Sequence, residues 1–271
     1  MIFILFILGI ILGSFVNALV WRLYLKTDPK NKNNTDLSIF RGRSMCPTCK
    51  HQLAPFDLIP IFSWIYLKGR CRYCHKGISI QYPIIELFTG LLFLMSYVYW
   101  PINFSLWSYI LLIIWLIVLV IFVSLALYDL KFKILPNNLV YVSTFLSLVF
   151  VLIYYLNFNQ TSGYLLTRVF GVVFSSGIFY FIYQISNGKW IGGGDVKLCF
   201  ALGLLIGGPL EAILMLFLAS VLGCFISFTL LLLGKFKSNM TIAFGPLLII
   251  STLVCFFFGP HIINWYTNLI G

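Results

Sequence analysis

Two aspartates stand where they could act together as a catalytic pair. Asp129 closes a long apolar run, and Asp195 follows three glycines at the start of another apolar segment. An acid inside a membrane helix costs about 2.5–3.5 kcal/mol on insertion scales, so an acid beside one usually has a function. When two carboxyl groups share a site, one stays protonated and the other charged, which permits general acid–base chemistry.

A structural role for each aspartate has to be weighed against this. Asp129 could pair with Lys131 or Lys133, and Asp195 could pair with Lys197, all at the level of lipid headgroups. The glycines before Asp195 favour a function, because they permit unusual backbone conformations and let another chain approach closely.

The elements that must position these acids are membrane helices. The 271-residue chain is 61% apolar and only 9% charged, and apolar runs of about 20 residues recur along it. Continuous runs of this length predict helices, whereas a membrane barrel would show short alternating segments. The sequence therefore predicts an all-α polytopic membrane protein of about eight spans, the sixth with a short apolar core that could be tilted or re-entrant. The expected spans lie near 2–21, 83–100, 106–128, 138–156, 164–184, 196–208, 211–233 and 243–267.

The positive charge indicates how the chain is oriented. The net charge is +11, and eleven of the 18 Lys and Arg residues fall within 22–82. The loops on the opposite side lack Lys and Arg, with Arg168 as an exception near the wrong end of its span. This bias predicts that 22–82 and both aspartates lie on the cytoplasmic side and that both termini lie outside. Anionic lipid is the expected partner of this charge, and no nucleic acid is expected because no base-reading motif is present.

The segment 22–82 carries a predicted metal site. Cys46-Pro47-Thr48-Cys49 and Cys71-Arg72-Tyr73-Cys74 form two C-x-x-C knuckles. Paired knuckles indicate a tetrahedral zinc site whose ligands are Cys46, Cys49, Cys71 and Cys74. Two disulfides are disfavoured in the cytoplasm, and a redox-active C-x-x-C is a weaker alternative. A structural zinc ion would organise a segment too small to build its own core.

Polar residues elsewhere in the spans have structural or functional interpretations. Asn17 lies inside the first span and must find a hydrogen-bond partner, most simply between helices. Glu86 lies near the positive end of the second helix dipole. Gly245-Pro246 starts the last span, either as a simple helix start or as part of a cleft beside the aspartates. The expected organisation is a first helix (1–21), a cytoplasmic zinc-ribbon-like insert (22–82) and a transmembrane catalytic bundle (83–271).

Taken in order, these motifs resemble the type IV prepilin peptidases, which include the peptidase of the Gram-positive competence pseudopilus. The resemblance covers nearly the whole chain. It includes the cysteine knuckles, Asp129 with Pro136 and Leu139, and a second motif that resembles the family's Gly-x-Gly-Asp. The residues that carry it elsewhere are Gly13, Ser14, Phe15, Asn17, Arg22, Ile78, Ser79, Tyr82, Pro83, Glu86, Gly192, Gly194, Asp195, Lys197, Phe244, Gly245 and Pro246.

The resemblance implies an intramembrane aspartic endopeptidase of the bacterial cytoplasmic membrane. Asp129 and Asp195 would be catalytic, and Gly192, Gly194, Lys197, Glu86 and Asn17 would shape the site or position the substrate. The substrates would be prepilins or pseudopilins of type IV pilus or competence systems, cut after a short basic leader at the cytoplasmic face. Many members also methylate the new N-terminus with S-adenosylmethionine, an activity associated with the insert.

Two other functions remain as alternatives. In an ion- or proton-coupled transporter the same aspartates would carry protons or cations. Such transporters often show internal repeats and acids near the bilayer midplane, whereas no clear repeat is found and these acids lie at one end. A membrane-tethered zinc ribbon that acts only in docking would leave the aspartates unexplained.

Overall fold

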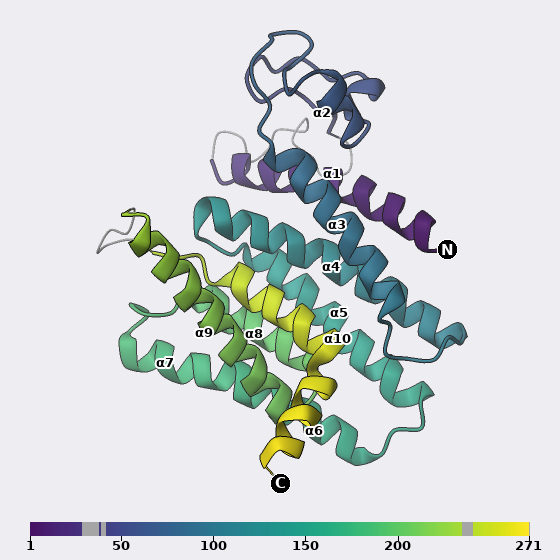
Figure 1. Cartoon of the computed structure of the whole chain (residues 1–271), viewed down its shortest axis with the longest axis vertical. Coiled ribbons are helices and arrows are strands. Elements are labelled where there is room, and N and C mark those ends of the chain that lie inside the picture. Colours follow the sequence, from purple (N-terminus) through teal and green to yellow (C-terminus); the bar gives the residue numbers. More distant parts are fainter. Residues whose placement is uncertain (29–37, 39–41, 235–240, 271) are drawn as a thin grey trace. The chain divides into compact units, whose positions relative to one another are not determined.

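The structure is a computed structural model that describes residues 1–28, 38, 42–234 and 241–270. It divides into two units, Met1–Trp100 and Pro101–Gly271. Every regular element in the described part is a helix (Figure 1), and isolated bridges join Met45 to Gln52 and Arg70 to Gly77. The prediction of an all-α protein with a compact cysteine-containing insert is confirmed.

Seven of the described helices are long and apolar enough to cross a membrane. The fifth of them is interrupted, because α6 (Ser162–Val172) and α7 (Ile178–Ser186) are joined by a π-helical turn, η4 (Val173–Gly177). The other six are α1 (Ile2–Leu25), α3 (Gln81–Val98), α4 (Leu106–Phe132), α5 (Asn137–Asn157), α9 (Pro209–Leu232) and α10 (Gly245–Ile270).

The predicted sixth span is a shorter helix, α8 (Gly193–Ile206). Its 14 residues extend over about 21 Å, whereas the hydrocarbon core of a bilayer is about 30 Å thick. Most of its apolar residues are covered by protein: Leu198, Cys199, Ala201 and Leu202 are fully buried, whereas Phe200 is exposed. The helix contacts α5, α6, α7, α9, α10 and η4, so it is the central element of its unit.

Within the first unit, α1 and α3 pack at glycines. A Cβ atom on Gly9 would lie 2.8 Å from the Cα of Gly90, and one on Gly13 would lie 2.7 Å from the Cα of Glu86. The insert between these helices holds two short helices, η3 (Pro55–Leu58) and α2 (Phe62–Tyr66). Close backbone approach at small residues is a common way for membrane helices to associate.

The glycine contact between α1 and α3 predicts a stability effect. We expect Gly13→Ala to destabilise the protein by about 1–3 kcal/mol, because the added methyl group overpacks the contact with α3. Thermal unfolding of the purified protein in detergent measures this effect. Gly77→Ala is the matched control, since a Cβ there would meet nothing within 4 Å. Equal unfolding temperatures for the two variants would contradict the close contact.

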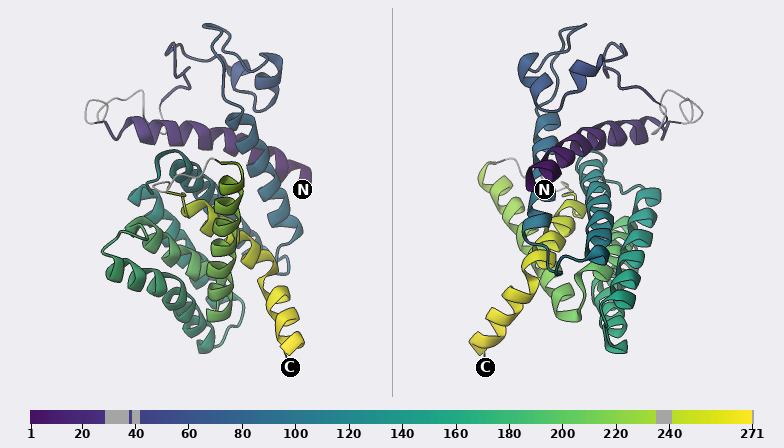
Figure 2. Two further views of the ribbon diagram at one scale, coloured as in Figure 1. Left: turned by 60° about the vertical axis from the view of Figure 1, so that its left-hand side comes forward. Right: turned by 90° about the vertical axis from the view of Figure 1, so that its right-hand side faces the viewer.

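The second unit packs α4 to α10 around a buried aromatic and aliphatic core. Trp115 of α4 is fully buried and stacks on Phe256 of α10 with ring centroids 3.8 Å apart. Figure 2 shows that the C-terminal half of α10 extends beyond the other helices of this unit. Large apolar side chains such as Phe145, Phe217 and Phe225 are exposed on its outside, as expected for a surface that faces lipid.

Candidate active site and metal centre

Asp129 lies in the last turn of α4, where the helix ends with Lys133 in the left-handed conformation. Its side chain is only 5% exposed. The backbone N–H of Gly245 donates to Oδ2 of Asp129 at 3.0 Å. Because Gly245 is the first residue of α10, the positive end of that helix dipole is directed at the carboxyl group.

Asp195 lies in the first turn of α8, after Gly192 in an extended conformation at the N-cap. A Cβ atom on Gly192 would lie 3.4 Å from Oδ2 of Asp195, so this oxygen faces the glycine. The other oxygen, Oδ1, is buried and has no hydrogen-bond partner among the described residues. Such an atom is costly unless it binds water, a proton or an incoming ligand.

The two aspartates share one site, with Leu135 packed beside it. A Cβ atom on Gly194 would lie 3.1 Å from the Cβ of Leu135, and one on Gly245 would lie 3.5 Å from its Cδ2. Leu135 thus links the Gly194–Asp195 end of α8 to Gly245, whose backbone N–H binds Asp129. Glycine at 194 and 245 therefore leaves room for Leu135 and for the carboxyl groups.

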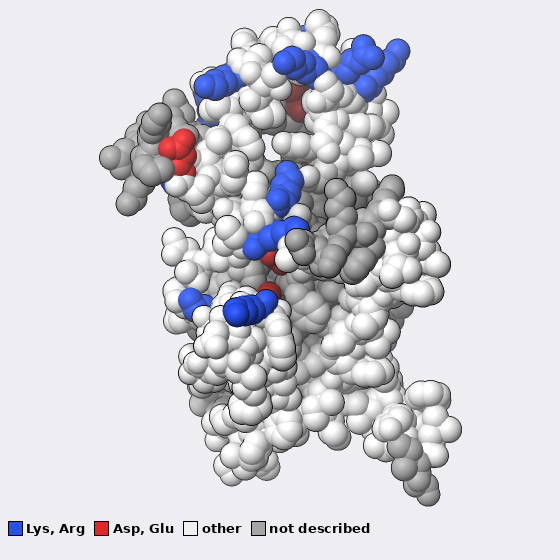
Figure 3. Space-filling view, turned by 90° about the vertical axis from the view of Figure 1, so that its left-hand side faces the viewer, with Lys and Arg blue, Asp and Glu red and all other residues white. Residues whose placement is uncertain are grey.

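The structure does not support simple pairing of these aspartates with lysines. The Nζ of Lys133 donates to Oγ1 of Thr241 at 2.8 Å, and the Nζ of Lys197 donates to Oδ1 of Asn137 at 3.0 Å. Within the described residues the ion pair found joins Arg72 and Asp57, at 2.8 Å. On the face drawn in Figure 3, Lys and Arg project outward, while acidic atoms lie recessed near the middle of the view and one acid is exposed at its edge.

Asn17 and Glu86 belong to the first unit and connect its parts. Nδ2 of Asn17 donates to the carbonyl oxygen of Tyr82 at 3.3 Å, and Oδ1 of Asn17 accepts from Nε2 of Gln81 at 3.2 Å. Oε2 of Glu86 accepts from the backbone N–H of Ile61 at 2.7 Å. Asn17 thus joins α1 to the start of α3, and Glu86 holds the insert against α3.

The four knuckle cysteines come together in the insert. Their Sγ atoms all lie within 4.8 Å of one another, and Cys46 Sγ is 3.9 Å from Cys74 Sγ. Zn–S bonds of about 2.3 Å in a tetrahedral site put sulfur atoms about 3.8 Å apart, so the arrangement fits zinc. All seven cysteines are free thiols, which argues against the disulfide alternative.

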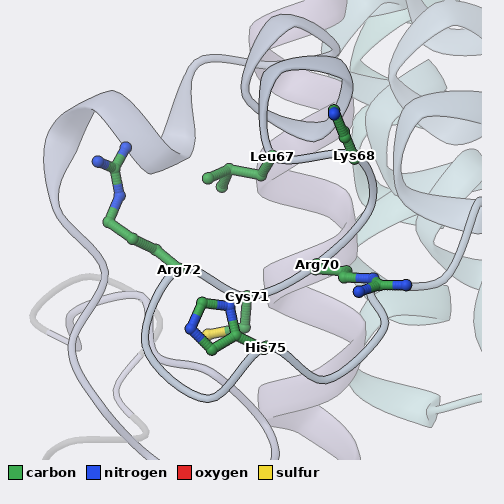
Figure 4. Close-up of a pocket in the computed structure, with 6 residues that line it drawn as sticks. All are labelled: Leu67, Lys68, Arg70, Cys71, Arg72 and His75. Carbon is green, nitrogen blue, oxygen red and sulfur yellow. The ribbon is translucent and has the colours of Figure 1, made fainter.

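Local structure prepares these cysteines for a metal. Burial raises the pKa of the Cys46 thiol, but hydrogen bonds with the backbone of Cys49 and Thr48 outweigh it and bring this pKa to about 7. Thiolates are the form that binds metal. His75 lies next to Cys71 (Figure 4), and the His51 ring packs on Tyr73 of the other knuckle at 3.7 Å. The candidate ligand group itself consists of the four sulfurs.

Comparisons with known proteins identify relatives along most of the chain. The bacterial peptidase A24 N-terminal domain matches residues 7–100, and the type IV leader peptidase family matches residues 110–228. A prepilin leader peptidase/N-methyltransferase from Pectobacterium carotovorum is 31% identical over 90% of this chain and 88% of its own length. The chain belongs to the type IV leader peptidase family.

Relatives in the type IV leader peptidase family span the chain almost completely. Proteins named prepilin leader peptidase/N-methyltransferase from Aeromonas salmonicida and Bacillus subtilis are 30% and 29% identical, over 98% and 99% of this chain and 93% and 99% of their own. No solved structure matches the chain significantly. The chain is therefore a multi-pass membrane hydrolase of this family, and these relatives give the transporter alternative no support.

Proposed function

We propose that this chain is an intramembrane aspartic endopeptidase that removes the leader of type IV prepilins or pseudopilins. The observation that carries the proposal is the shared site of Asp129 and Asp195, which α4, α8 and the start of α10 bring together within one unit. Family membership supports the substrate class, since the relatives are named for prepilin processing.

In the proposed reaction the two carboxyl groups take different roles. The charged carboxylate removes a proton from a water molecule, whose oxygen attacks the carbonyl carbon of the scissile peptide bond. The protonated carboxyl group donates to the carbonyl oxygen and stabilises the negative charge that develops there. The carbon–nitrogen bond then breaks, and the leaving nitrogen takes a proton from the carboxyl group that received it from water. The roles belong to a coupled pair rather than to one named residue.

We further propose that cleavage takes place at the cytoplasmic face of the bacterial cytoplasmic membrane. The cluster of Lys and Arg in 22–82 supports this orientation through the positive-inside rule. A prepilin with a basic leader in the cytoplasm and an apolar helix in the bilayer would present its scissile bond at the depth of the aspartates. Prepilin and lipid are the expected partners.

Co-expression with a prepilin tests the proposed function. The chain and a candidate prepilin are produced together, and the mass of the prepilin is measured after extraction from the membrane. Loss of the leader at one peptide bond supports the proposal. Uncut precursor for every prepilin tested, with correctly inserted enzyme, would count against a peptidase and in favour of a different use of the aspartates.

The contact between Gly245 and Asp129 predicts a specific defect. A Cβ atom at 245 would lie 2.8 Å from Oδ2 of Asp129, so Gly245→Ala must displace the carboxyl group. We expect about a 100-fold loss in the cleavage rate, as for a misplacement of about 1 Å in other active sites. Gly259→Ala, in the same helix, is the control, since its nearest contact would be 3.7 Å. Full activity of Gly245→Ala would show that this carboxyl position is not required.

A second activity, methylation of the new N-terminus, is proposed from the names of the relatives. S-adenosylmethionine would supply the methyl group. The first unit has a cavity of about 530 Å³ between α1 and the insert, lined in part by Ser14, Phe15 and Arg22, and this volume suits a small cofactor. The guanidinium of Arg22 already donates to the carbonyl oxygens of Ser38 and Gly42. The support for cofactor binding is therefore the volume of the cavity. The mass of the cut pilin shows whether a methyl group is added.

A further inference from the structure

The short helix α8 carries Asp195, and the length of this helix does not by itself fix its depth in the membrane. A helix of about 21 Å can slide along its axis in a bilayer of about 30 Å unless its neighbours hold it. One neighbour, the interrupted span Ser162–Ser186, supplies polar side chains to the backbone of α8 along its whole length.

Three side chains of this span donate to carbonyl oxygens of α8. The Oγ of Ser176 donates to Val196 at 3.0 Å, next to Asp195 in the chain. The Oγ of Ser175 donates to Cys199 at 3.1 Å. At the far end, Nη1 of Arg168 donates to Leu204 and Leu205 at 3.2 and 2.9 Å, where the last carbonyl groups of α8 have no partner within the helix.

The π-helical turn η4 explains how two adjacent serines reach the same helix. Successive residues of an α-helix point about 100° apart, so neighbours seldom face one partner. The wider turn at Val173–Gly177 changes the register where Ser175 and Ser176 occur. Such π turns inside helices are frequent at functional sites.

Glycines bring the two backbones close enough for these short side chains. A Cβ atom on Gly171 would lie 2.9 Å from the carbonyl oxygen of Gly207 and 3.0 Å from that of Gly203. A Cβ atom on Gly203 would collide with the Oγ of Ser175. Sliding of α8 would break these hydrogen bonds and the glycine contact together.

We propose that Ser176, Ser175 and Arg168 are positioning residues that fix the axial position of α8 and so place the Asp195 carboxyl group for cleavage. This inference rests on the proposed peptidase function. This role also explains why Arg168 lies on the side of the membrane where the loops otherwise lack Lys and Arg. Its guanidinium caps the carbonyl groups at the end of α8.

Cleavage kinetics of the full chain in lipid nanodiscs, with a prepilin as substrate, test the proposal. Ser176→Ala is expected to lower kcat about tenfold and Ser175→Ala with Ser176→Ala about 100-fold, with KM changed less than twofold. Ser176→Thr keeps a hydroxyl donor and should restore most of kcat. Ser220→Ala is the control, because Ser220 donates to Leu216 of its own helix, and wild-type kinetics are expected.

A readout other than activity separates positioning from the chemistry itself. Cys199 is fully buried in α8, so its alkylation by a maleimide reports how often α8 is displaced. The labelled peptide is identified by mass spectrometry. The double serine variant should label Cys199 several times faster than wild type at an unchanged unfolding temperature, whereas Asp195→Asn should label at the wild-type rate.

Two results would overturn the proposal, and they can be told apart. If the double serine variant cleaves and labels as wild type while Asp195→Asn is inactive, α8 is held by other contacts. If Asp195→Asn cleaves normally, the peptidase role of Asp195 fails, and the positioning role of the serines fails with it.

Discussion

Asp129→Asn and Asp195→Asn are each expected to abolish leader removal, with a loss of about 10⁴-fold or more in kcat. Asparagine keeps the size of the side chain at both positions. At position 129 it can still accept the hydrogen bond from the backbone N–H of Gly245. It cannot exchange a proton at the reaction pH, so neither water activation nor proton return is possible. The mass of the co-expressed prepilin should then show only the uncut precursor.

The double variant sharpens this test. Since the two carboxyl groups work as a unit, removing both should cost little more than removing one. Asp28→Asn, at an exposed aspartate after α1, is the matched control and should cleave normally. Normal cleavage by either single variant, with the same membrane insertion as wild type, would exclude the aspartic mechanism.

Loss of one knuckle cysteine is expected to remove the metal and unfold the insert. Purified wild-type chain should contain about one zinc ion per molecule under reducing conditions, and Cys71→Ser should contain much less. Apparent binding free energies of structural zinc in small domains are about 10–16 kcal/mol at neutral pH, which is more than a small insert gains from its own packing. Metal analysis and limited proteolysis within residues 42–80 measure the two effects.

Cys224→Ser provides the control for this prediction, because Cys224 is exposed on α9 and lies outside the four-sulfur cluster. It should keep the zinc content and the protease resistance of wild type. The backbone after each knuckle is expected to add to this dependence on a metal. Lys50 and His75 are non-glycine residues in left-handed conformations directly after the knuckles, and such residues cost about 1–2 kcal/mol each. Wild-type protein without zinc but with a protected insert would contradict the metal site.

The sequence was sufficient for the helices and for the candidate pair. Long apolar runs define membrane helices almost without tertiary information, because the bilayer leaves few alternatives. The same reasoning placed Asp129 at the end of one span and Asp195 at the start of another, and the structure brings them into one site. The knuckle spacing likewise predicted the cluster of four sulfurs.

Other features could not be predicted, because they depend on which helices become neighbours. Ser175 and Ser176 look like ordinary small residues of an apolar span, and no local pattern marks the π-helical turn that directs them to α8. Arg168 stood out only as an exception to the charge bias. The sequence also could not decide whether Lys133 and Lys197 pair with the aspartates, since hydrogen bonds to Thr241 and Asn137 depend on the fold.

The hydrogen bond from Gly245 to Asp129 bears on how the site responds to salt. Its stabilising charge is a fraction of an elementary charge at the end of α10, and peptide dipoles neither titrate nor exchange with ions. Lys133 and Lys197 donate to Thr241 and Asn137 rather than to the acids, and both remain cations. Their attraction to the acids is screened over about 8 Å at physiological salt, whereas a buried contact is screened much less. High ionic strength should therefore weaken the attraction of the lysines and leave the contact with Gly245 in place.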